Sequence, residues 1–269
     1  MSHVIKKSSI STSWGSIAIT EQGDQSAPAV ILSHSILASS MMWEEQLAVL
    51  ANAGWRAVAI DTRGHGQSSA TTPPYTLDEL GLDIITAMDQ LGLAKAHFVG
   101  LSLGGMIGFG LGIHHGDRLE SLCICDARAD APTPFFNQWN DRMEIAKREG
   151  CQALALPTTE RWFGKAFLET HPEIATRFQK TISETSLNGY IGCAQAIQQL
   201  PYLEQLGKIA VRTTLIVGSN DAPLPETMKD IQSRIPGANF ELIPNAGHLP
   251  NIDQASAFNA ALLRHLNAH

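Results

Sequence analysis

Short apolar segments recur along the first half of the chain, and polar or turn-forming residues separate them. Runs of this length that are rich in Val, Ile, Ala and Leu are typical of strands buried in a sheet. The later segments are separated by helix-length amphipathic stretches, such as TLDELGLDIITAMDQLGL at 76–93. The predicted strands are residues 14–20, 29–33, 56–61, 96–100 and 119–126.

Alternation of strand and helix is typical of βαβ units, which place parallel strands in one sheet with helices on both faces. The pattern resumes with strands predicted at 211–218 and 239–244, and it ends with a helix at 255–266. We therefore predict an α/β fold with a mostly parallel central sheet.

The segment from 128 to 206 has a different pattern. It contains no convincing strand, and prolines interrupt several predicted helices. A helical insert between two strands of a sheet predicts a cap over the strand ends. We expect a core domain made of residues 1–127 and 207–269 and a helical cap subdomain of residues 128–206.

Composition excludes several classes of protein. Hydrophobic residues make up 44% of the 269 residues and charged residues 17%, which excludes a disordered chain. The formal net charge is −7 and no basic run is longer than Lys6-Lys7, so we expect no nucleic-acid partner. The sequence has no signal-peptide pattern and no segment approaching 18 apolar residues, so we expect a cytoplasmic protein without a membrane partner.

The four cysteines do not form a metal-binding pattern, because no C-x-x-C occurs. Cys123 and Cys125 alternate within an apolar strand, so both are expected to be buried on one face. We predict no metal site.

Gly100-Leu101-Ser102-Leu103-Gly104 matches the pattern G-x-S-x-G, directly after a predicted strand and at the start of a helix-length stretch. Strand, tight turn and helix is the context that a nucleophile elbow needs. Ser102 is therefore the predicted nucleophile. Glycines at 104, 108 and 112 would share one helix face and pack closely on the sheet. A dinucleotide-binding loop is excluded, because Gly108, Gly110 and Gly112 give G-x-G-x-G and not G-x-G-x-x-G, and they lie inside the predicted helix and not before it.

A serine nucleophile needs a general base, which in this arrangement follows it in the chain in the order Ser, acid, His. His248 lies in a loop after the last predicted strand, from which its imidazole can reach the serine. We expect the other histidines after Ser102 to be solvated at the surface: His114, His115, His171, His265 and His269. Asp221 ends the strand before the His248 loop and is the preferred acid, and Asp126, at the end of an earlier strand, is its rival.

Hydrolysis through a tetrahedral intermediate also needs an oxyanion hole. We expect one N–H from Leu103, directly after the nucleophile, and a second from Ile36 in the turn after the strand at 29–33. His34, in the same turn, is predicted to form structural hydrogen bonds. A turn that supplies this oxyanion N–H usually carries a His-Gly pair, and this sequence has His34-Ser35 at that place.

These segments together resemble the α/β-hydrolase superfamily over nearly the whole chain, and within it the 3-oxoadipate enol-lactonases. The resemblance is carried by DTRGHGQSS (61–69), AHFVGLSLGGMIG (96–108), TTERWFGKAF (158–167), GYIGCAQAI (189–197) and NAGHLPNID (245–253). It implies hydrolysis of a small-molecule ester or lactone through an acyl-enzyme, without a cofactor. A carbon–carbon bond hydrolase, a perhydrolase or a hydrolase-like ligand sensor would keep the same triad, whereas a dehalogenase or epoxide hydrolase would need a carboxylate in place of Ser102.

The cap is predicted to supply the substrate-binding residues. Trp139 and Arg142 lie three residues apart in a predicted helix and so share a face. If that face points toward Ser102, the indole forms an apolar wall and the guanidinium binds a substrate carboxylate. Trp162 is the second cap tryptophan expected in the pocket. The alternative is that Trp139 packs in the cap core and Arg142 is solvated or paired with a surface acid.

Overall fold

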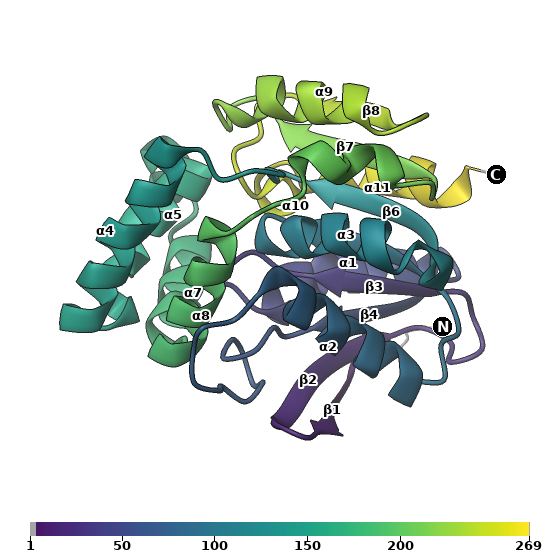
Figure 1. The fold of residues 1–269 in the computed structure, drawn as a ribbon, viewed down its shortest axis with the longest axis horizontal. Helices are drawn as coiled ribbons and strands as arrows, with labels where there is room; N and C mark the ends of the chain where they lie inside the picture. The colour runs from purple at the N-terminus through teal and green to yellow at the C-terminus, as the bar shows by residue number, and fades with distance from the viewer. Residues whose placement is uncertain (1–3, 269) are drawn as a thin grey trace.

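The structure is a computed structural model that describes residues 4–268, and these residues are built around one eight-stranded sheet (Figure 1). The strands are β1 (Lys6–Thr12), β2 (Gly15–Gln22), β3 (Ala29–Ser33), β4 (Arg56–Ile60), β5 (Ala96–Leu101), β6 (Leu119–Cys125), β7 (Thr213–Gly218) and β8 (Asn239–Ile243). Their order is β1-β2-β4-β3-β5-β6-β7-β8. The pairs β1–β2 and β2–β4 are antiparallel and the other pairs are parallel. The predicted mostly parallel sheet is confirmed.

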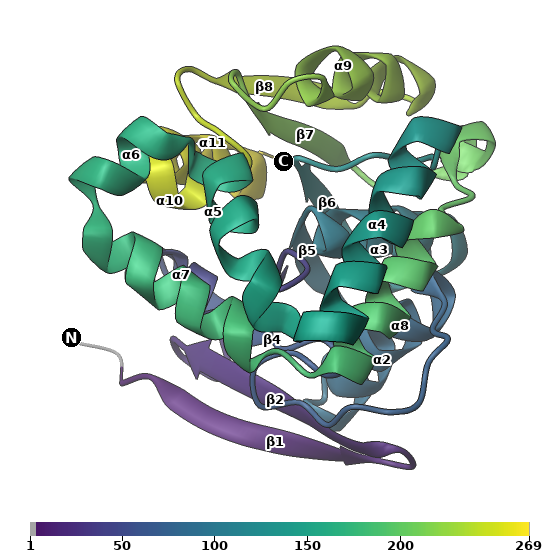
Figure 2. The same cartoon turned by 90° about the vertical axis from the view of Figure 1, so that its left-hand side faces the viewer.

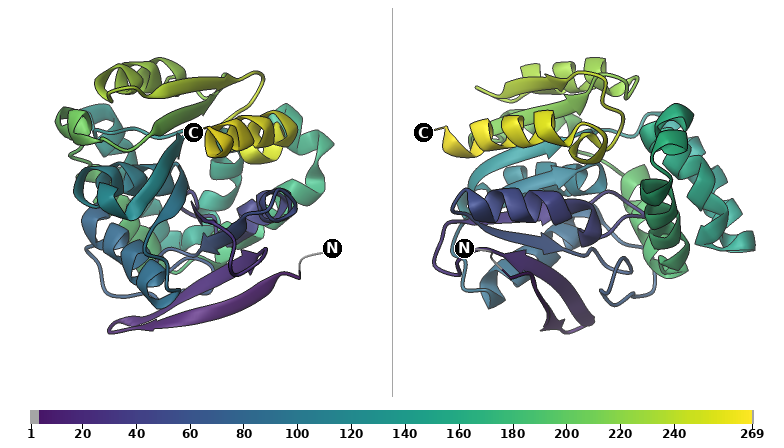
Figure 3. Two further views of the ribbon diagram at one scale, coloured as in Figure 1. Left: turned by 90° about the vertical axis from the view of Figure 1, so that its right-hand side faces the viewer. Right: turned by 180° about the vertical axis from the view of Figure 1, so that it is seen from behind.

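Helices cover both faces of this sheet. The core helices are α1 (Glu44–Asn52), α2 (Leu77–Gln90), α3 (Leu103–His114), α9 (Leu224–Arg234), α10 (Pro250–Asp253) and α11 (Ala255–Asn267), with short 3₁₀ helices η1 (Ser40–Trp43), η2 (Gly116–Arg118) and η4 (Leu203–Lys208). α1 and α11 contact each other on one face (Figure 3), and α2 and α3 contact each other on the opposite face (Figure 1). α9 packs against β7 and β8.

Seven of the eight strands coincide with the predicted apolar runs, and β1 is the strand that the pattern missed. In β1 only Ile10 is buried, and the other residues are exposed or half-exposed. An edge strand that pairs on one side and faces solvent does not need an apolar run. The pattern of apolar residues therefore gives little indication of strand β1.

The cap helices lie together at one end of the molecule, facing the viewer in Figure 2. They are α4 (Thr133–Glu149), η3 (Cys151–Leu154), α5 (Ala155–Phe163), α6 (Lys165–Thr170), α7 (Pro172–Glu184) and α8 (Leu187–Gln198). A single β-bridge between Asp130 and Pro201 joins the chain entering this region to the chain leaving it. The division at 128 and 206 remains our prediction for the subdomain boundary.

Close packing of α3 on the sheet positions the turn that precedes it. A Cβ built on Gly104 would lie 2.3 Å from the backbone oxygen of Ser33, and one on Gly108 would lie 2.6 Å from Ile124 Cδ1. The contact at Gly104 is with backbone and leaves no room for a side chain, whereas the one at Gly108 is with the end of a side chain that would have to shift. The predicted glycine face does bring the helix close to the strands. The helix start is thereby held against β3 and β5.

Candidate active site

Ser102 occupies a strained turn between β5 and α3. Its backbone has φ 58° and ψ −113°, a conformation that non-glycine residues rarely adopt. Its N–H donates to the oxygen of Cys125 at 2.8 Å. A Cβ on Gly100 would lie 2.1 Å from the oxygen of Gly104, so the glycines of the motif let the chain fold back on itself. The predicted strand, tight turn and helix are all present.

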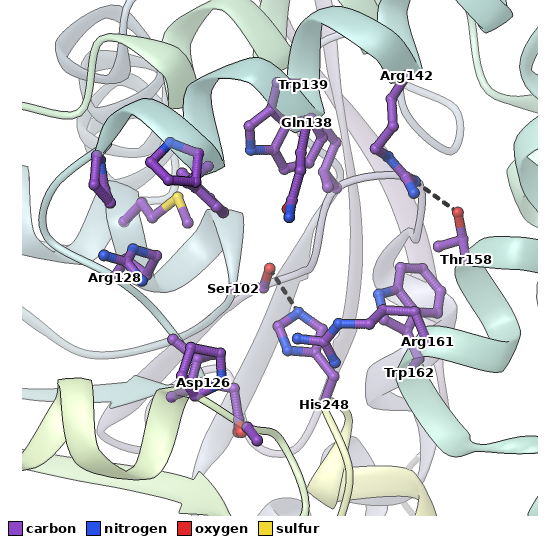
Figure 4. Close-up of a pocket in the computed structure, with 18 residues that line it drawn as sticks. Ser102, Asp126, Arg128, Gln138, Trp139, Arg142, Thr158, Arg161, Trp162 and His248 are labelled. Atoms are coloured by element: carbon purple, nitrogen blue, oxygen red, sulfur yellow. Dashed lines mark hydrogen bonds between the residues drawn. The ribbon is translucent and has the colours of Figure 1, made fainter.

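The three side chains predicted to act together are brought into one chain of contacts. Ser102 Oγ lies 3.0 Å from His248 Nε2 (Figure 4). His248 Nδ1 in turn lies 2.6 Å from Asp221 Oδ2. Asp221 follows β7 and is fully buried, and His248 lies in the loop between β8 and α10. These distances suit proton transfer from a hydroxyl to an imidazole that a carboxylate orients.

Asp126, the rival acid, lies beside Asp221 but has a different partner. Its Oδ1 accepts the N–H of Gly218 at 2.9 Å, and its Oδ2 has no hydrogen-bond partner among the described residues. Burial raises the pKa of Asp126 well above its usual range, and repulsion from the Asp221 charge adds to the effect. Burial and repulsion thus disfavour the charged form of Asp126, whereas the hydrogen bond to His248 belongs to Asp221.

Asp221 is ionised despite its burial. Desolvation raises its pKa, but the charges of His248 and Arg161 outweigh that effect and lower the pKa to about 2. Ligand-type atoms of Asp126, Asp221 and His248 lie within 4.8 Å of one another. Because both ring nitrogens of His248 already have side-chain partners, the imidazole has no free nitrogen for a cation.

Of the two residues predicted to supply the oxyanion hole, one lines the cavity and the other begins α3. Ile36 lines the cavity beside Ser102, and Leu103 is the first residue of α3, where an N–H has no partner within the helix. Among residues 4–268, neither N–H has a hydrogen-bond acceptor. The two loops are tied together because the N–H of Gly104 donates to the oxygen of His34 at 3.1 Å.

His34 has the structural hydrogen bonds that the sequence predicted. Its Nδ1 donates to the oxygen of Ser35 at 2.7 Å, and its Nε2 accepts the N–H of Thr62 at 2.9 Å. Burial lowers the pKa of His34, although Asp61 opposes the shift, so the ring stays neutral. The hydroxyl of Ser35 is buried without a hydrogen-bond partner.

A cavity of about 380 Å³ opens over Ser102 and His248. Its floor comes from the core, including Ile36 and Met106, and its roof comes from α4 and α5 of the cap. Figure 4 shows cap side chains surrounding the serine from above and from one side. A space of this size accommodates a small organic molecule.

The predicted pair Trp139 and Arg142 lies in α4 and lines this cavity. The guanidinium carbon of Arg142 is 5.6 Å from the centre of the Trp139 ring, as expected for residues three apart on one helix face. Arg142 donates to Thr158 Oγ1 at 2.7 Å, while its Nε is buried without a partner. Among residues 4–268 no carboxylate pairs with Arg142, so the alternative of pairing with a surface acid is not seen there, and the role of Arg142 in substrate binding stays a prediction.

Trp162 lies in α5 and also lines the cavity. Its side chain is only 4% exposed and packs edge-on against Phe163 and Phe178. Its backbone oxygen accepts the N–H of His248 at 2.8 Å. Trp162 thus joins the wall of the cavity to the loop that carries the imidazole.

The cavity is also lined by polar side chains that the sequence analysis did not identify. They are Arg128, Gln138 and Arg161 (Figure 4). Arg161 contacts Asp221 Oδ1 at 2.6 Å, and Arg128 contacts Asp130 Oδ1 at 2.9 Å. Arg161 precedes Trp162 in the segment that carried the family resemblance. No short-range pattern marks it, because its partner lies 60 residues away along the chain.

The surface prediction for the other histidines is wrong for His265. His265 is buried, and its ring contacts Ser121 Oγ and Thr214 Oγ1, both at 2.8 Å. It lies on the face of α11 that packs on the sheet, where two hydroxyls satisfy both nitrogens. His114 is exposed, His115 and His171 are half-buried, and His269 lies outside the described residues.

The four cysteines are free and buried, which confirms the predicted burial of Cys123 and Cys125. The sulfurs of Cys123 and Cys125 lie 3.9 Å apart on one face of β6. No helix within residues 4–268 is long and apolar enough to cross a bilayer.

Comparison with known proteins places this geometry in a family. A sequence model of the α/β-hydrolase fold matches residues 28–255. A 3-oxoadipate enol-lactonase of Acinetobacter baylyi is 32% identical over 243 residues, which cover 89% of each chain. An enol-lactonase structure from Burkholderia xenovorans aligns with a TM-score of 0.92 and 30% identity, over 97% of this chain and 100% of that one.

A malate-bound esterase structure from Thermogutta terrifontis aligns with a TM-score of 0.87 and 27% identity, over 97% of this chain and 98% of that one. The fold, the turn at Ser102 and these matches agree over nearly the full length of the protein. The chain therefore belongs to the α/β-hydrolase family, and its relatives include enol-lactonases.

Proposed function

We propose that this protein hydrolyses a carboxylic ester or lactone of a small molecule through an acyl-enzyme at Ser102. The single observation that carries the proposal is the contact chain from Ser102 Oγ through His248 to Asp221, at 3.0 and 2.6 Å, on the floor of a cavity. A serine hydroxyl that is hydrogen-bonded to an oriented imidazole is the arrangement that acyl transfer requires.

In this mechanism His248 takes the proton of Ser102 as the serine oxygen attacks the ester carbonyl. The N–H groups of Ile36 and Leu103 stabilise the oxyanion of the tetrahedral intermediate. His248 then gives its proton to the leaving alkoxide, and the acyl group remains on Ser102. Water repeats the sequence with the same base, which releases the acid and restores the serine.

The cavity supports a small acidic substrate. Arg142 has an unpartnered Nε and lies over the Trp139 ring, so its guanidinium is available to a carboxylate remote from the scissile bond. Trp139 and Trp162 supply apolar walls. An enol-lactone that carries a carboxylate has this chemistry, and one relative is named as a 3-oxoadipate enol-lactonase. A neighbour of known structure binds malate, which is also a carboxylate.

The test is a substrate panel of neutral p-nitrophenyl esters, small lactones and an acidic enol-lactone, assayed with wild type and Ser102→Ala. We expect turnover of acidic lactones or esters by wild type and a loss on the order of 10⁶-fold in kcat for the variant. A fast burst followed by steady turnover identifies an enzyme, whereas one slow turnover identifies a ligand sensor. Cleavage of a 1,3-diketone substrate without ester hydrolysis would identify a carbon–carbon bond hydrolase. Retention of a tenth of the activity by Ser102→Ala would contradict the proposal.

A further inference from the structure

Three buried or half-buried carboxyl groups lie close together behind His248. Asp126 follows β6, Asp221 follows β7, and Asp253 ends α10. Burial raises the pKa of Asp126 well above its usual range and that of Asp253 to about 6, and charge repulsion from Asp221 contributes to both shifts. In such surroundings the three groups do not all ionise, and the positive charges nearby decide which of them carries the negative charge.

Two cationic groups pair with Asp221 among the described residues, His248 and Arg161. Each contacts a different oxygen of the carboxylate: His248 contacts Oδ2 and Arg161 contacts Oδ1, each at 2.6 Å. A general base must be neutral before it accepts a proton. In that state Arg161 is the one permanent positive charge among the described residues that faces the carboxylate.

Arg161 reaches Asp221 from the cap. Its side chain is 51% exposed and extends from α5 toward His248 (Figure 4), whereas Asp221 is fully buried. The next residue, Trp162, accepts the N–H of His248 at 2.8 Å through its backbone oxygen. A Cβ on Gly247 would lie 2.3 Å from that same oxygen. The last turn of α5 therefore contacts both the loop that carries Asp221 and the loop that carries His248.

We propose that Arg161 is a positioning residue through which the cap keeps the negative charge on Asp221 and orients Asp221 toward His248. The proposal rests on the triad mechanism proposed above. It makes the end of α5 part of the acid–base apparatus as well as part of the substrate cavity. Loss of the Arg161 charge then weakens catalysis without weakening substrate binding.

The variants that test it are Arg161→Gln, Arg161→Lys and a matched control, Arg177→Gln. Arg177 also joins the cap to the core, since it contacts Glu44 at 2.5 Å and its side chain is 47% exposed. It lies on α7, outside the cavity lining. The first readout is kcat and KM on one neutral ester and one acidic ester, measured as a function of pH.

We expect Arg161→Gln to lower kcat roughly 10- to 100-fold on both substrates, with KM nearly unchanged, because base catalysis of this type contributes about 10²–10⁴-fold in total. The acidic limb of the rate profile should move to higher pH, since a cation near the imidazole opposes formation of the imidazolium. Arg161→Lys should recover part of kcat, and Arg177→Gln should match wild type. A rise in KM confined to the acidic ester would overturn the proposal, because it would make Arg161 a substrate-binding residue.

A second readout does not depend on turnover. The proton on His248 Nδ1 in a short hydrogen bond to a carboxylate gives a far-downfield ¹H NMR signal, and His248→Gln identifies it. We expect this signal to shift or to broaden by exchange in Arg161→Gln and to remain in Arg177→Gln. An unchanged signal in Arg161→Gln contradicts the positioning role even if no ester is hydrolysed. Absence of ester hydrolysis with an altered signal contradicts only the proposed function.

Discussion

The core and the cap contribute to the same cavity but are packed very differently. Every residue of β3, β4 and β7 is buried, and a Cβ on Gly104 of α3 would lie 2.3 Å from the backbone oxygen of Ser33. In α4, by contrast, 17 residues include only two buried ones, Met143 and Ala146. The predicted reacting groups therefore depend on a close-packed scaffold. The residues of α4 that line the cavity instead lie on a helix with few packing constraints.

The largest expected change in kcat that tests this comparison comes from substituting the two aspartates of the core, Asp221 and Asp126. Asp221→Asn should lower kcat on the order of 10⁴-fold, because an amide favours the wrong tautomer of His248. Asp126→Asn should change kcat far less, because His248 contacts Asp221 and not Asp126, and burial already disfavours the charged form of Asp126. Steady-state kinetics of both variants on the same ester measures the ranking. The reverse ranking would transfer the acid to the end of β6.

A cap residue should instead alter selectivity. Arg142→Ala should lose about 1.5–3 kcal/mol of transition-state binding on an acidic lactone and almost nothing on a neutral short-chain ester. The control is Thr158→Val, which removes the hydrogen bond to Arg142 but keeps the charge, so selectivity for the acidic substrate should persist. Comparison of kcat/KM on the two substrates gives the result. Equal losses on both would mean that Arg142 only supports the cap.

The packing of the core can be broken without touching a reacting side chain. A Cβ at Gly104 would meet the backbone oxygen of Ser33, so Gly104→Ala should lower the free energy of unfolding by about 1–3 kcal/mol. Gly116→Ala is the control, since nothing lies within 4 Å of its Cβ position, and its effect should stay within about 0.5 kcal/mol. Urea unfolding monitored by circular dichroism measures both values. Equal stabilities would show that α3 can move away from the sheet.

The smallest expected effect is a dependence of stability on pH. Burial lowers the pKa of His65 and of His265 to about 3, so both rings are neutral in the folded protein. An unfolded histidine binds a proton near pH 6.5, so stability is complete above that pH and decreases as the pH falls toward 3. From pH 7.5 to 5.5 each such histidine should cost about 1.4 kcal/mol.

The variant His265→Gln tests this predicted decrease of stability with falling pH. The variant should lose about 1.4 kcal/mol less than wild type between pH 7.5 and 5.5, because one proton-binding site disappears from the unfolded chain. Urea denaturation at the two pH values gives both differences. An identical decrease in wild type and variant would mean that His265 does not stay neutral in the folded state.

Sequence patterns were sufficient where the signal is local or periodic. Seven strands, the elbow at Ser102 and the loop position of His248 follow from apolar runs, a motif and its flanks. The choice of Asp221 over Asp126 followed from chain order alone, and the structure gives Asp221 the hydrogen bond to His248. The pair Trp139 and Arg142 was found because a helix repeats every 3.6 residues.

The patterns failed where long-range packing decides the environment of a side chain. His265 was assigned to the surface because a histidine near the chain end usually is exposed, yet α11 turns it toward two hydroxyls of the sheet. β1 was missed because an edge strand needs only one buried residue.

The sequence by itself determined the order of strands and helices along the chain, the predicted nucleophile and the residue types of its predicted partners, since these depend on local periodicity and on short motifs. Only the tertiary structure decided which of two carboxyl groups contacts His248, which nitrogen contacts which oxygen, and that Arg161 of the cap reaches the acid of the core. The reason is physical. Ionisation and hydrogen-bond geometry depend on burial and on charges brought together by folding, and residues 60 positions apart, such as Arg161 and Asp221, have no signal in common along the chain.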